Sequence, residues 1–326
     1  MMGALCALAV TQAGLILAAP ALRAYWPFSW YYHVVFRTVL QDTQRHRWKY
    51  WATPAFYAGV YAYCVWLFYG EVYAEIAKAL WVPERWVLPA AVVAPAAAGV
   101  AAAATPAAVP ADAAYDGLLF HDGVECRTCR VRKPARSRHC GVCGRCVPLA
   151  DHHCVWLNNC VGRGNYGLFY LALGAHCALL TYGAVRLPLA APAGRWPRAL
   201  LALELLVASF AVLCVWFTAT QVALVRDGMT TNEQDKWYAV QESMREGTLV
   251  RLRGRFYHRV EGGDGVEFYS TNAYDHRTYA LHNEPYAVVT SHEEIPNVYD
   301  TGSFCENLRQ RLDPQARIFR RRVRGL

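Results

Sequence analysis

Long stretches without a charged side chain constrain this chain more than any other feature of its sequence. Charged residues are absent from residues 4 to 22, 51 to 70, 86 to 110 and 164 to 185, and residues 200 to 225 contain only Glu204. A helix rises about 1.5 Å per residue and the hydrocarbon layer is about 30 Å thick, so a span needs about 20 apolar residues. With 55% hydrophobic and 18% charged residues, the chain is too apolar for a soluble domain of its size. The runs predict a polytopic membrane helix bundle.

Two of the five runs have a second interpretation. The run from 86 to 110 is mostly alanine and contains Pro89, Pro95 and Pro106. It is therefore either a span or a flexible linker, and the bundle has four or five spans. The first run has the length of a signal peptide, but no basic residue precedes it, so we expect an uncleaved anchor.

Basic residues between the runs predict the orientation. Residues 23 to 50 hold one acid, Asp42, and five basic residues, which are Arg23, Arg37, Arg45, Arg47 and Lys49. Loops rich in Lys and Arg stay in the cytosol. Counting spans from this loop places residues 111 to 163 and the carboxyl-terminal segment in the cytosol as well. The loop between the last two runs disagrees, because it puts basic residues on the opposite side: Arg186, Arg195 and Arg198.

Seven of the 12 cysteines lie between residues 126 and 160. With three histidines they read Cys126-x2-Cys129, then His139-Cys140-x2-Cys143-x2-Cys146, then Asp151-His152-His153-Cys154, then Cys160. In the reducing cytosol, disulfides are disfavoured. A two-residue gap suits a turn that points both sulfurs at one tetrahedral ion, so the cluster predicts zinc binding.

Ten side chains of this cluster are possible soft ligands, and two closed tetrahedral zinc sites use eight of them. If each site has three cysteines and one histidine, one thiol and one imidazole remain, which is the minimum equipment for a nucleophilic cysteine. The spacing does not identify this pair. Asp151 favours the end of the cluster at residues 151 to 154, because a carboxylate beside His152 can orient its imidazole and stabilise the imidazolium.

Three motifs, in this order, resemble the DHHC-type protein S-acyltransferases, or palmitoyltransferases. Residues 126 to 165, with Asp151-His152-His153-Cys154 followed by Val155 to Gly162, resemble the cysteine-rich domain of that family. Thr230-Thr231-Asn232-Glu233 is similar to its TTxE motif, and residues 297 to 307 are similar to its aromatic/Asn motif. The chain departs from the family at Asp116-Gly117, which lacks the proline of the usual Asp-Pro-Gly turn.

The resemblance implies a fold class that is mainly α: a polytopic membrane helix bundle of four or five spans, a loop-rich cytosolic domain with two structural zinc ions, and a small cytosolic carboxyl-terminal lobe. Its parts are the amino-terminal spans with the basic loop (1–110), the cysteine-rich zinc domain (111–163), the last two spans (164–225) and the carboxyl-terminal segment (226–326). The implied ligands of the first zinc are Cys126, Cys129, His139 and Cys146. Those of the second are Cys140, Cys143, His153 and Cys160.

The resemblance also implies a reaction, in which Cys154 takes a fatty acyl group from an acyl-coenzyme A such as palmitoyl-CoA and passes it to a protein thiol. His152 with Asp151 is expected to lower the pKa of Cys154. Thr231 and Glu233 are expected to brace this end of the site.

Three basic residues match family positions that face the nucleotide of coenzyme A: Lys133, Arg136 and Arg138. For each of them, contact with lipid headgroups or water stays open. The expected partners are proteins with membrane-proximal cysteines and the bilayer itself, and not nucleic acid. The expected location is an endomembrane, the ER or the Golgi, with the site facing the cytosol.

Two patterns concern the carboxyl-terminal segment. Alternation at Val250, Leu252, Phe256 and Val260, followed by Glu261 to Gly265, predicts a β-hairpin on a small lobe. Near the end, five arginines form either a membrane-surface patch or a solvated terminus, and the net charge of +8 suits the former. They are Arg317, Arg320, Arg321, Arg322 and Arg324.

Two other functions compete with the enzyme. One is a zinc-ribbon module on a membrane anchor, which would use its basic surface for acidic partners or nucleic acid. The other is an acyltransferase-like scaffold without turnover. The intact Asp-His-His-Cys run, the spare thiol and the position about a dozen residues before a span favour the enzyme.

Overall fold

The computed structural model describes residues 11–12, 14–15, 17–41, 44–110, 113–192, 196–262, 265–271, 275, 278–279, 281 and 284–313. The five tail arginines, Arg195 and about half of the first apolar run lie outside these residues. The chain divides into two compact units, residues 1–56 and 57–326.

The described part of the first unit is helical and rich in aromatic and basic side chains. It contains α2 (Phe28–Tyr31), the π-helical η1 (Tyr32–Gln41), the 3-10 helix η2 (Arg47–Trp51) and the start of α3 (Ala52–Leu67). Trp26, Trp30 and Trp48 are exposed. Exposed tryptophans among arginines are typical of a membrane-water interface.

Three helices are long and apolar enough to cross a membrane: α5 (Val82–Ala104), α6 (Tyr166–Ala190) and α7 (Arg198–Arg226). The chain is an integral membrane protein. The linker interpretation of residues 86 to 110 is wrong, because α5 continues through Pro89 and Pro95 and ends only at Ala104. The run from 51 to 70 is also helical, but as α3 of 16 residues followed by the π-helical η3 (Phe68–Val72), α4 (Tyr73–Ile76) and the 3-10 helix η4 (Ala77–Ala79).

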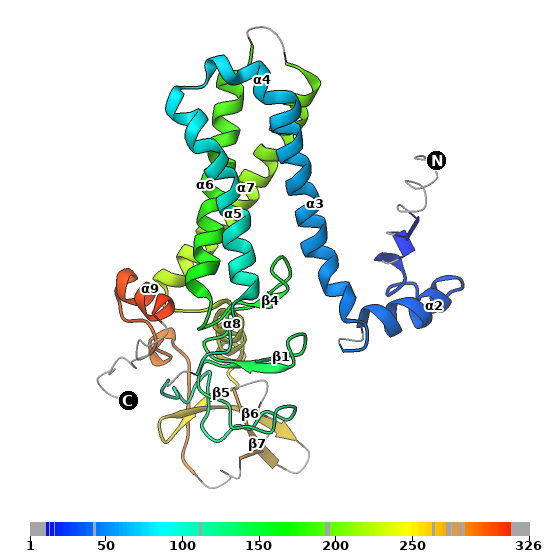
Figure 1. Ribbon diagram of the computed structural model, residues 1–326. Coiled ribbons are helices and arrows are strands. Elements are labelled where there is room, and N and C mark those ends of the chain that lie inside the picture. Colours follow the sequence, from blue (N-terminus) through cyan, green and yellow to red (C-terminus); the bar gives the residue numbers. More distant parts are fainter. Residues whose placement is uncertain are drawn as a thin grey trace. The chain divides into compact units, whose positions relative to one another are not determined.

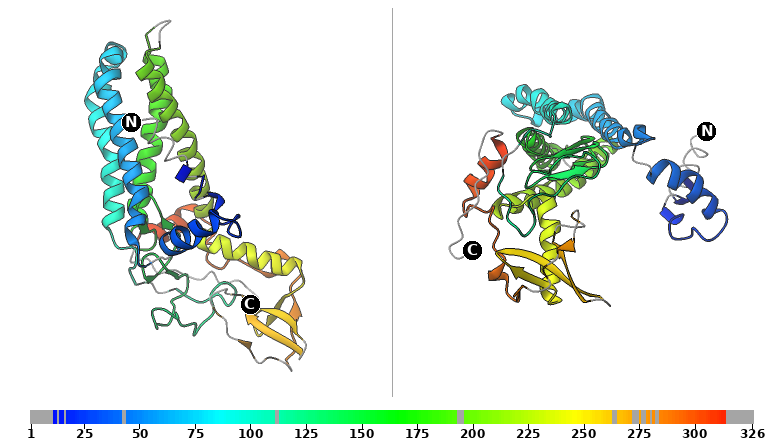
Figure 2. Two further views of the ribbon diagram at one scale, coloured as in Figure 1. Left: turned by 90° about the vertical axis from the view of Figure 1, so that its right-hand side faces the viewer. Right: turned by 90° about the horizontal axis from the view of Figure 1, so that it is seen from below.

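The helices α5, α6 and α7 run side by side, as Figure 1 and Figure 2 show. At the end far from the cysteine-rich segment, Arg186 Nε lies 2.7 Å from Glu84 Oε1, and the Tyr182 hydroxyl donates to the same carboxylate at 2.9 Å. The charge of Arg186 is therefore neutralised by α5. Arg186, one of the basic residues that disagreed with the orientation argument, is therefore paired with an acid of α5.

The cysteine-rich segment contains two short antiparallel hairpins. One consists of β1 (Arg138–Cys140) and β2 (Arg145–Val147), and the other of β3 (His153–Cys154) and β4 (Asn159–Cys160). Most of the remaining chain in this segment is turns. With so few regular elements, bound metal ions would supply much of the stability of this segment.

The carboxyl-terminal lobe consists of α8 (Thr231–Arg245) and a five-stranded antiparallel sheet in the order β8-β7-β6-β5-β9. Its strands are β5 (Leu249–Leu252), β6 (Arg255–Gly262), β7 (Gly265–Ser270), β8 (Thr278–Tyr279) and β9 (Ala287–Val288). The predicted hairpin is β6 with β7, in which Gly262 pairs with Gly265. A second hairpin was not predicted: Arg253 and Gly254 turn β5 into β6 with φ of 49° and 75°, as tight two-residue hairpin turns require.

After the sheet, the chain forms the 3-10 helix η5 (His292–Glu294), the aromatic/Asn segment and α9 (Phe304–Leu312). One buried cluster joins the cysteine-rich segment, the base of α6, α8 and the sheet. It includes Leu149, Tyr166, Val240, Phe256 and Tyr299. The lobe is therefore packed onto the cysteine-rich segment as one body, at one end of the helices (Figure 1).

Candidate functional site

The eight implied zinc ligands form two separate groups, each built in the same way. In each group, two cysteines come from a two-residue gap: Cys129 N–H donates to Cys126 Sγ at 3.4 Å, and Cys143 N–H donates to Cys140 Sγ at 3.3 Å. The other two ligands are directly opposite residues of a hairpin, His139 with Cys146 and His153 with Cys160. Opposite residues point their side chains to the same side, so each turn and each hairpin aim at one point.

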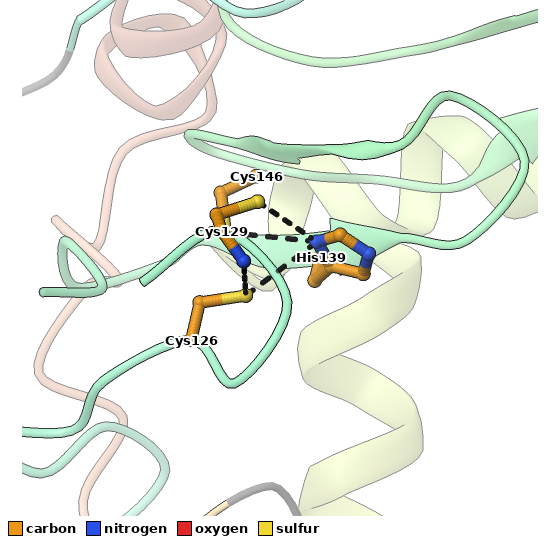
Figure 3. Close-up of side chains that lie close together, drawn as sticks. All are labelled: Cys126, Cys129, His139 and Cys146. Carbon is orange, nitrogen blue, oxygen red and sulfur yellow. Dashed lines mark hydrogen bonds between the residues drawn. The ribbon is translucent and has the colours of Figure 1, made fainter. Parts of the chain in front are cut away.

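The spacing of the ligand atoms fits a tetrahedral zinc ion. His139 Nδ1 lies 3.5 Å from Cys126 Sγ, 3.3 Å from Cys129 Sγ and 3.9 Å from Cys146 Sγ. Figure 3 shows the three sulfurs gathered around the His139 ring. His153 Nδ1 lies 3.6, 3.4 and 3.8 Å from the sulfurs of Cys140, Cys143 and Cys160. Tetrahedral bonds of about 2.3 Å to sulfur and about 2.0 Å to nitrogen place neighbouring ligand atoms about 3.5 Å apart. Both groups can therefore hold zinc.

Cys154 belongs to neither group of ligands. In the extended chain of β3, successive side chains point to opposite sides. His153 faces its three cysteines, whereas Cys154 packs in the cluster that contains Phe169 of α6. Its thiol is buried, with 7% of the residue exposed.

Asp151 and His152 lie within hydrogen-bonding distance of each other. Asp151 Oδ1 lies 3.2 Å from His152 Nδ1 and accepts the Thr231 backbone N–H at 3.1 Å. Asp151 Oδ2 accepts the Tyr166 hydroxyl at 2.7 Å. The carboxylate is fully buried and satisfied on both oxygens, so it holds the His152 ring with its other nitrogen free to face Cys154.

Burial and hydrogen bonding have opposite effects on the pKa values of His152 and Cys154. Burial alone lowers the pKa of His152, but its hydrogen bonds to Asp151 and Cys154 outweigh burial and raise that pKa to about 9. Burial raises the pKa of Cys154, and the hydrogen bond and charge of His152 reverse this and lower it below the ordinary value. The pair thus favours a thiolate beside an imidazolium more than an isolated cysteine would.

Aromatic rings fix the orientation of His152 from the membrane side. The ring of Phe169 on α6 lies 5.6 Å from it at 73°, and the ring of Phe217 on α7 lies 6.4 Å from it at 89°. Both contacts are edge-to-face, the favoured geometry for aromatic pairs. The imidazole therefore lies where the two helices meet the cysteine-rich segment.

Two asparagines pin the β3–β4 hairpin to the end of α5. Asn159 Nδ2 donates to the carbonyls of Ala103 and Thr105 at 3.1 and 2.9 Å. Asn165 Nδ2 donates to Ala102 O at 3.3 Å and to Cys160 O at 2.9 Å. The carbonyls of Ala102 and Ala103 belong to the last turn of α5 and that of Thr105 to its C-cap, so the helix itself supplies no N–H for them. The asparagines satisfy them and hold Cys154 at the end of a candidate span.

The TTxE-like motif begins α8. The Thr230 hydroxyl accepts the Glu233 N–H at 3.3 Å, and the Glu233 carboxylate accepts the Thr230 N–H at 2.9 Å, which is a capping box. Thr231 reaches Asp151 through its backbone, and Glu233 pairs with Arg136 rather than with the reacting groups. The motif therefore supports the site through the backbone and through Arg136.

The three residues expected at coenzyme A have different surroundings. Arg136 is buried: its Nε and Nη2 bind Glu233, and Nη2 also donates to Gly228 O at 3.0 Å. Lys133 is buried as well, and Arg138, at the start of β1, is half-buried. Lys133 and Arg138 are close enough to oppose each other's charge, whereas Arg136 faces the lobe.

The sequence interpretation missed Lys236, which lies one turn after Glu233 on α8. Its ammonium is 4.2 Å from the Phe120 ring centroid and is buried. Burial and the nearby Lys133 lower the pKa of Lys236 to about 7, against the opposing effect of Glu233 and Asp116. Spacing of three residues from Glu233 is the signal that places it on the same helix face. Tyr166 was also missed, and nothing in its local sequence marks it as a partner of Asp151.

The turn at Asp116 forms without the family's proline. Asp116 Oδ1 accepts the backbone N–H groups of Leu118 and Phe120 at 3.0 and 2.8 Å. Gly117 has φ of 70°, a conformation that glycine adopts without strain. The carboxylate therefore does the work of stabilising the turn.

Comparisons with known proteins agree with the motifs. The family model described as DHHC palmitoyltransferase matches residues 120–238. Palmitoyltransferase SWF1 of Kluyveromyces lactis is 42% identical over 93% of this chain and 96% of its own length. Palmitoyltransferase SWF1 of Saccharomyces cerevisiae is 42% identical over 90% of this chain and 94% of its own length. Palmitoyltransferase ZDHHC4 of Bos taurus is 59% identical over a shorter stretch, 18% of this chain and 17% of its own length.

These matches confirm the resemblance and the enzyme class inferred from the sequence. The matched region contains both groups of zinc ligands, the Asp-His-His-Cys run and the first part of α8, up to residue 238. The relatives from the two yeasts extend the likeness to almost the whole chain, including the helices. The chain belongs to the DHHC palmitoyltransferase family.

Proposed function

We propose that this chain transfers a long-chain fatty acyl group from acyl-coenzyme A, through an acyl-Cys154 intermediate, to cysteine thiols of membrane-associated proteins. One observation carries the proposal: Cys154 is excluded from both groups of metal ligands and lies beside His152, which Asp151 orients. A buried thiol with an oriented imidazole is the arrangement of a nucleophilic cysteine.

In the first step, the Cys154 thiolate attacks the carbonyl carbon of the acyl-CoA thioester. The new C–S bond to Cys154 forms as the C–S bond to coenzyme A breaks, and the leaving thiolate takes the proton from the His152 imidazolium. His152 is then neutral. Asp151 keeps its ring in place throughout, because the carboxylate is held by Thr231 and Tyr166 as well.

In the second step, neutral His152 takes the proton of a substrate thiol, and that sulfur attacks the acyl-Cys154 carbonyl. The bond to Cys154 breaks and the Cys154 thiolate is restored beside imidazolium. Each step exchanges one thioester for another, so neither needs an external energy source. The enzyme has to supply a thiolate, alignment and a place for the chain.

The position of Cys154 suits a lipid donor. Asn159 ties the hairpin to the last turn of α5, and Phe169 of α6 packs near the thiol. An acyl chain on Cys154 would therefore enter the apolar region between the helices. Burial of methylenes at about 0.8 kcal/mol each makes a long chain a binding contribution on the order of 10 kcal/mol before ordering costs.

Three cations are the candidates for binding the phosphates of coenzyme A: Lys133, Arg138 and Lys236. Lys133 and Arg138 oppose the charge of Lys236, and Glu233 and Asp116 favour it. An anionic ligand would relieve this repulsion, which favours a phosphate there. Arg136, expected at the same site, already donates to Glu233 and Gly228, so its role is to join α8 to the cysteine-rich segment.

Zinc in the two groups of ligands would stabilise the hairpins that carry His152 and Cys154. We assign the active site to the cytosolic face of an ER or Golgi membrane, because the basic residues before α3 favour that orientation. The membrane location also determines the substrates, which are proteins with cysteines close to the bilayer.

The test is acylation of the purified full-length chain with a clickable palmitoyl-CoA. We expect the chain to gain an adduct that hydroxylamine removes, Cys154→Ser to gain none, and Cys305→Ser to gain the normal amount. Cys305 is the matched control, since it is an exposed cysteine outside both groups of ligands. An adduct that persists in Cys154→Ser would overturn the assignment.

A further inference from the structure

The last helix of the described chain, α9, buries one arginine in the junction of three other elements. Arg311 is 3% exposed. Its Nη1 donates to the Tyr170 hydroxyl on α6 at 2.8 Å, and its Nη2 donates to Leu224 O on α7 at 2.7 Å and also to Met229 O. Among the described residues, no carboxylate forms an ion pair with it. A buried cation without an ion pair is costly, so its surroundings must compensate for it.

Two of the groups that Arg311 contacts lead directly to Asp151. Its guanidinium carbon lies 5.7 Å from the ring centroid of Tyr166, and the hydroxyl of Tyr166 donates to Asp151 Oδ2 at 2.7 Å. Met229 immediately precedes Thr230 and Thr231, and the Thr231 N–H donates to Asp151 Oδ1 at 3.1 Å. Each oxygen of the carboxylate is thus held by an element that Arg311 fixes.

Other hydrogen bonds of α9 hold the helix in place but do not connect it to Asp151. Asn307 Nδ2 donates to Arg226 O at 3.2 Å and to Asp300 at 2.8 Å. These bonds seat the helix on the end of α7. Among the residues that the structure describes, the side chain of Arg309 on the same helix hydrogen-bonds to Glu306 alone, in an exposed ion pair whose side chains are 60% and 36% exposed.

We propose that Arg311 is a positioning residue for acyl transfer, which sets the Asp151 carboxylate through Tyr166 and the turn between α7 and α8. It touches neither the acyl donor nor the reacting sulfur. The inference rests on the proposed function, because it assigns Asp151 to the orientation of His152. It extends the active site to the carboxyl-terminal helix.

Tyr166 and the turn at Met229 hold the Asp151 carboxylate in different ways. Loss of the contact with Tyr166 lets the phenol rotate and weakens one hydrogen bond to Asp151. Loss of the contact with Met229 loosens the turn that presents the Thr231 N–H. Either change lets the carboxylate move, and a shift of about 1 Å in a catalytic group costs up to about 100-fold in rate.

The experiment measures the rate of acyl-Cys154 formation against acyl-CoA concentration, in the full-length chain in detergent. Arg311→Leu is expected to lower the maximal rate about 10- to 100-fold and to leave the half-saturating concentration within about twofold. Arg309→Leu is the matched control and is expected to stay within about twofold of the wild-type rate. Zinc content and unfolding temperature of each variant separate a positioning effect from loss of the fold.

A double-mutant cycle with Tyr166→Phe tests the path. If Arg311 acts through Tyr166, the double variant is expected to lie within about threefold of the slower single variant. If the rate losses of the two single variants multiply fully in the double variant, Arg311 does not act through Tyr166. A wild-type rate in Arg311→Leu would overturn the proposal as a whole. If Arg311→Leu loses zinc, the variant Tyr170→Phe is tested in its place. Tyr170→Phe removes one hydrogen-bond acceptor of Arg311 but leaves the charge of Arg311 unchanged. A wild-type rate in Tyr170→Phe would then also overturn the proposal. Failure of the proposed function looks different, since the wild type would then form no Cys154 adduct.

Discussion

Arg136 and Glu233 form a two-pronged ion pair between the cysteine-rich segment and α8, with Nε 2.5 Å from Oε1 and Nη2 2.6 Å from Oε2. Their side chains are 3% and 1% exposed. The guanidinium also lies 4.4 Å from the ring centroid of Tyr299, in the aromatic/Asn segment. The Arg136 side chain thus joins all three motifs in which the sequence resembles the family.

Removal of one partner of this pair is expected to destabilise the protein strongly. Glu233→Ala leaves Arg136 charged and buried without its carboxylate, and it also removes half of the capping box of α8. We expect a loss of about 3–5 kcal/mol of unfolding free energy, measured as thermal unfolding of the zinc-loaded protein in detergent. Glu306→Ala breaks the exposed pair with Arg309 and should cost less than about 1 kcal/mol. Equal effects of the two variants would contradict the structure.

Loss of a zinc ligand is expected to abolish acylation without a change at Cys154. Cys126→Ser and Cys140→Ser each remove one ligand, so we expect less than two zinc ions per chain and no hydroxylamine-sensitive adduct. Cys154→Ser should also lack the adduct but retain both ions, because Cys154 belongs to neither group. Metal analysis by mass spectrometry distinguishes the cases. A Cys154→Ser protein that has lost zinc would mean that this thiol is a ligand.

The affinity for coenzyme A is expected to fall as the pH rises from 7 to 9. Burial and Lys133 lower the pKa of Lys236 to about 7, and a bound phosphate stabilises its charged form. Binding therefore takes up a proton above pH 7, and a rise of one unit in the bound state corresponds to about a fivefold loss of affinity over this range. Titration calorimetry in two buffers of different ionisation enthalpy measures the uptake.

Lys236→Met is expected to bind coenzyme A more weakly at pH 7 and to show no such proton uptake. Lys78→Met, in the exposed part of η4, is the control and should behave like the wild type. If Lys236→Met keeps the pH dependence of the wild type, then Lys236 does not face the phosphates.

Gly164→Ala is expected to disrupt the contact between the end of the cysteine-rich segment and the chain after α5. A Cβ at Gly164 would lie 2.1 Å from the carbonyl oxygen of Pro106, whereas one at Gly141 would meet nothing within 4 Å. Overpacking against backbone costs about 1–3 kcal/mol or more. The unfolding temperature should therefore fall for Gly164→Ala and barely change for Gly141→Ala. Similar temperatures for both would contradict the close approach.

The sequence predicted the long helices well because a membrane span is a local property of composition. The sequence interpretation misplaced the start of α5 and the end of α6, and the cause is the same for both. The charge-free criterion began the third run at residue 86 and ended the fourth at 185, yet α5 begins at Val82 and α6 ends at Ala190. The excluded residues Glu84 and Arg186 are the two partners of one ion pair. A count of charges cannot detect that two of them cancel between helices.

The grouping of the metal ligands was also predictable, since the spacing and the resemblance together assign each cysteine and histidine. Partners distant in the sequence were not. Arg136 was expected at a phosphate, but its donors bind Glu233, 97 residues away. The same holds for Tyr166, whose role depends on how α6 meets Asp151. Such contacts depend on tertiary packing, to which the identity of the residue alone gives no access.

β3 places His153 and Cys154 in consecutive positions, with one side chain turned to the ligand group and the other to the helices. Neighbouring Cα atoms are about 3.8 Å apart, so a single peptide unit separates the anchor of the metal from the reacting sulfur. No linker lies between them to absorb a displacement. A distortion of the second ion's coordination is therefore transmitted undamped to the nucleophile, and an insertion of one residue here would turn the thiol to the wrong face.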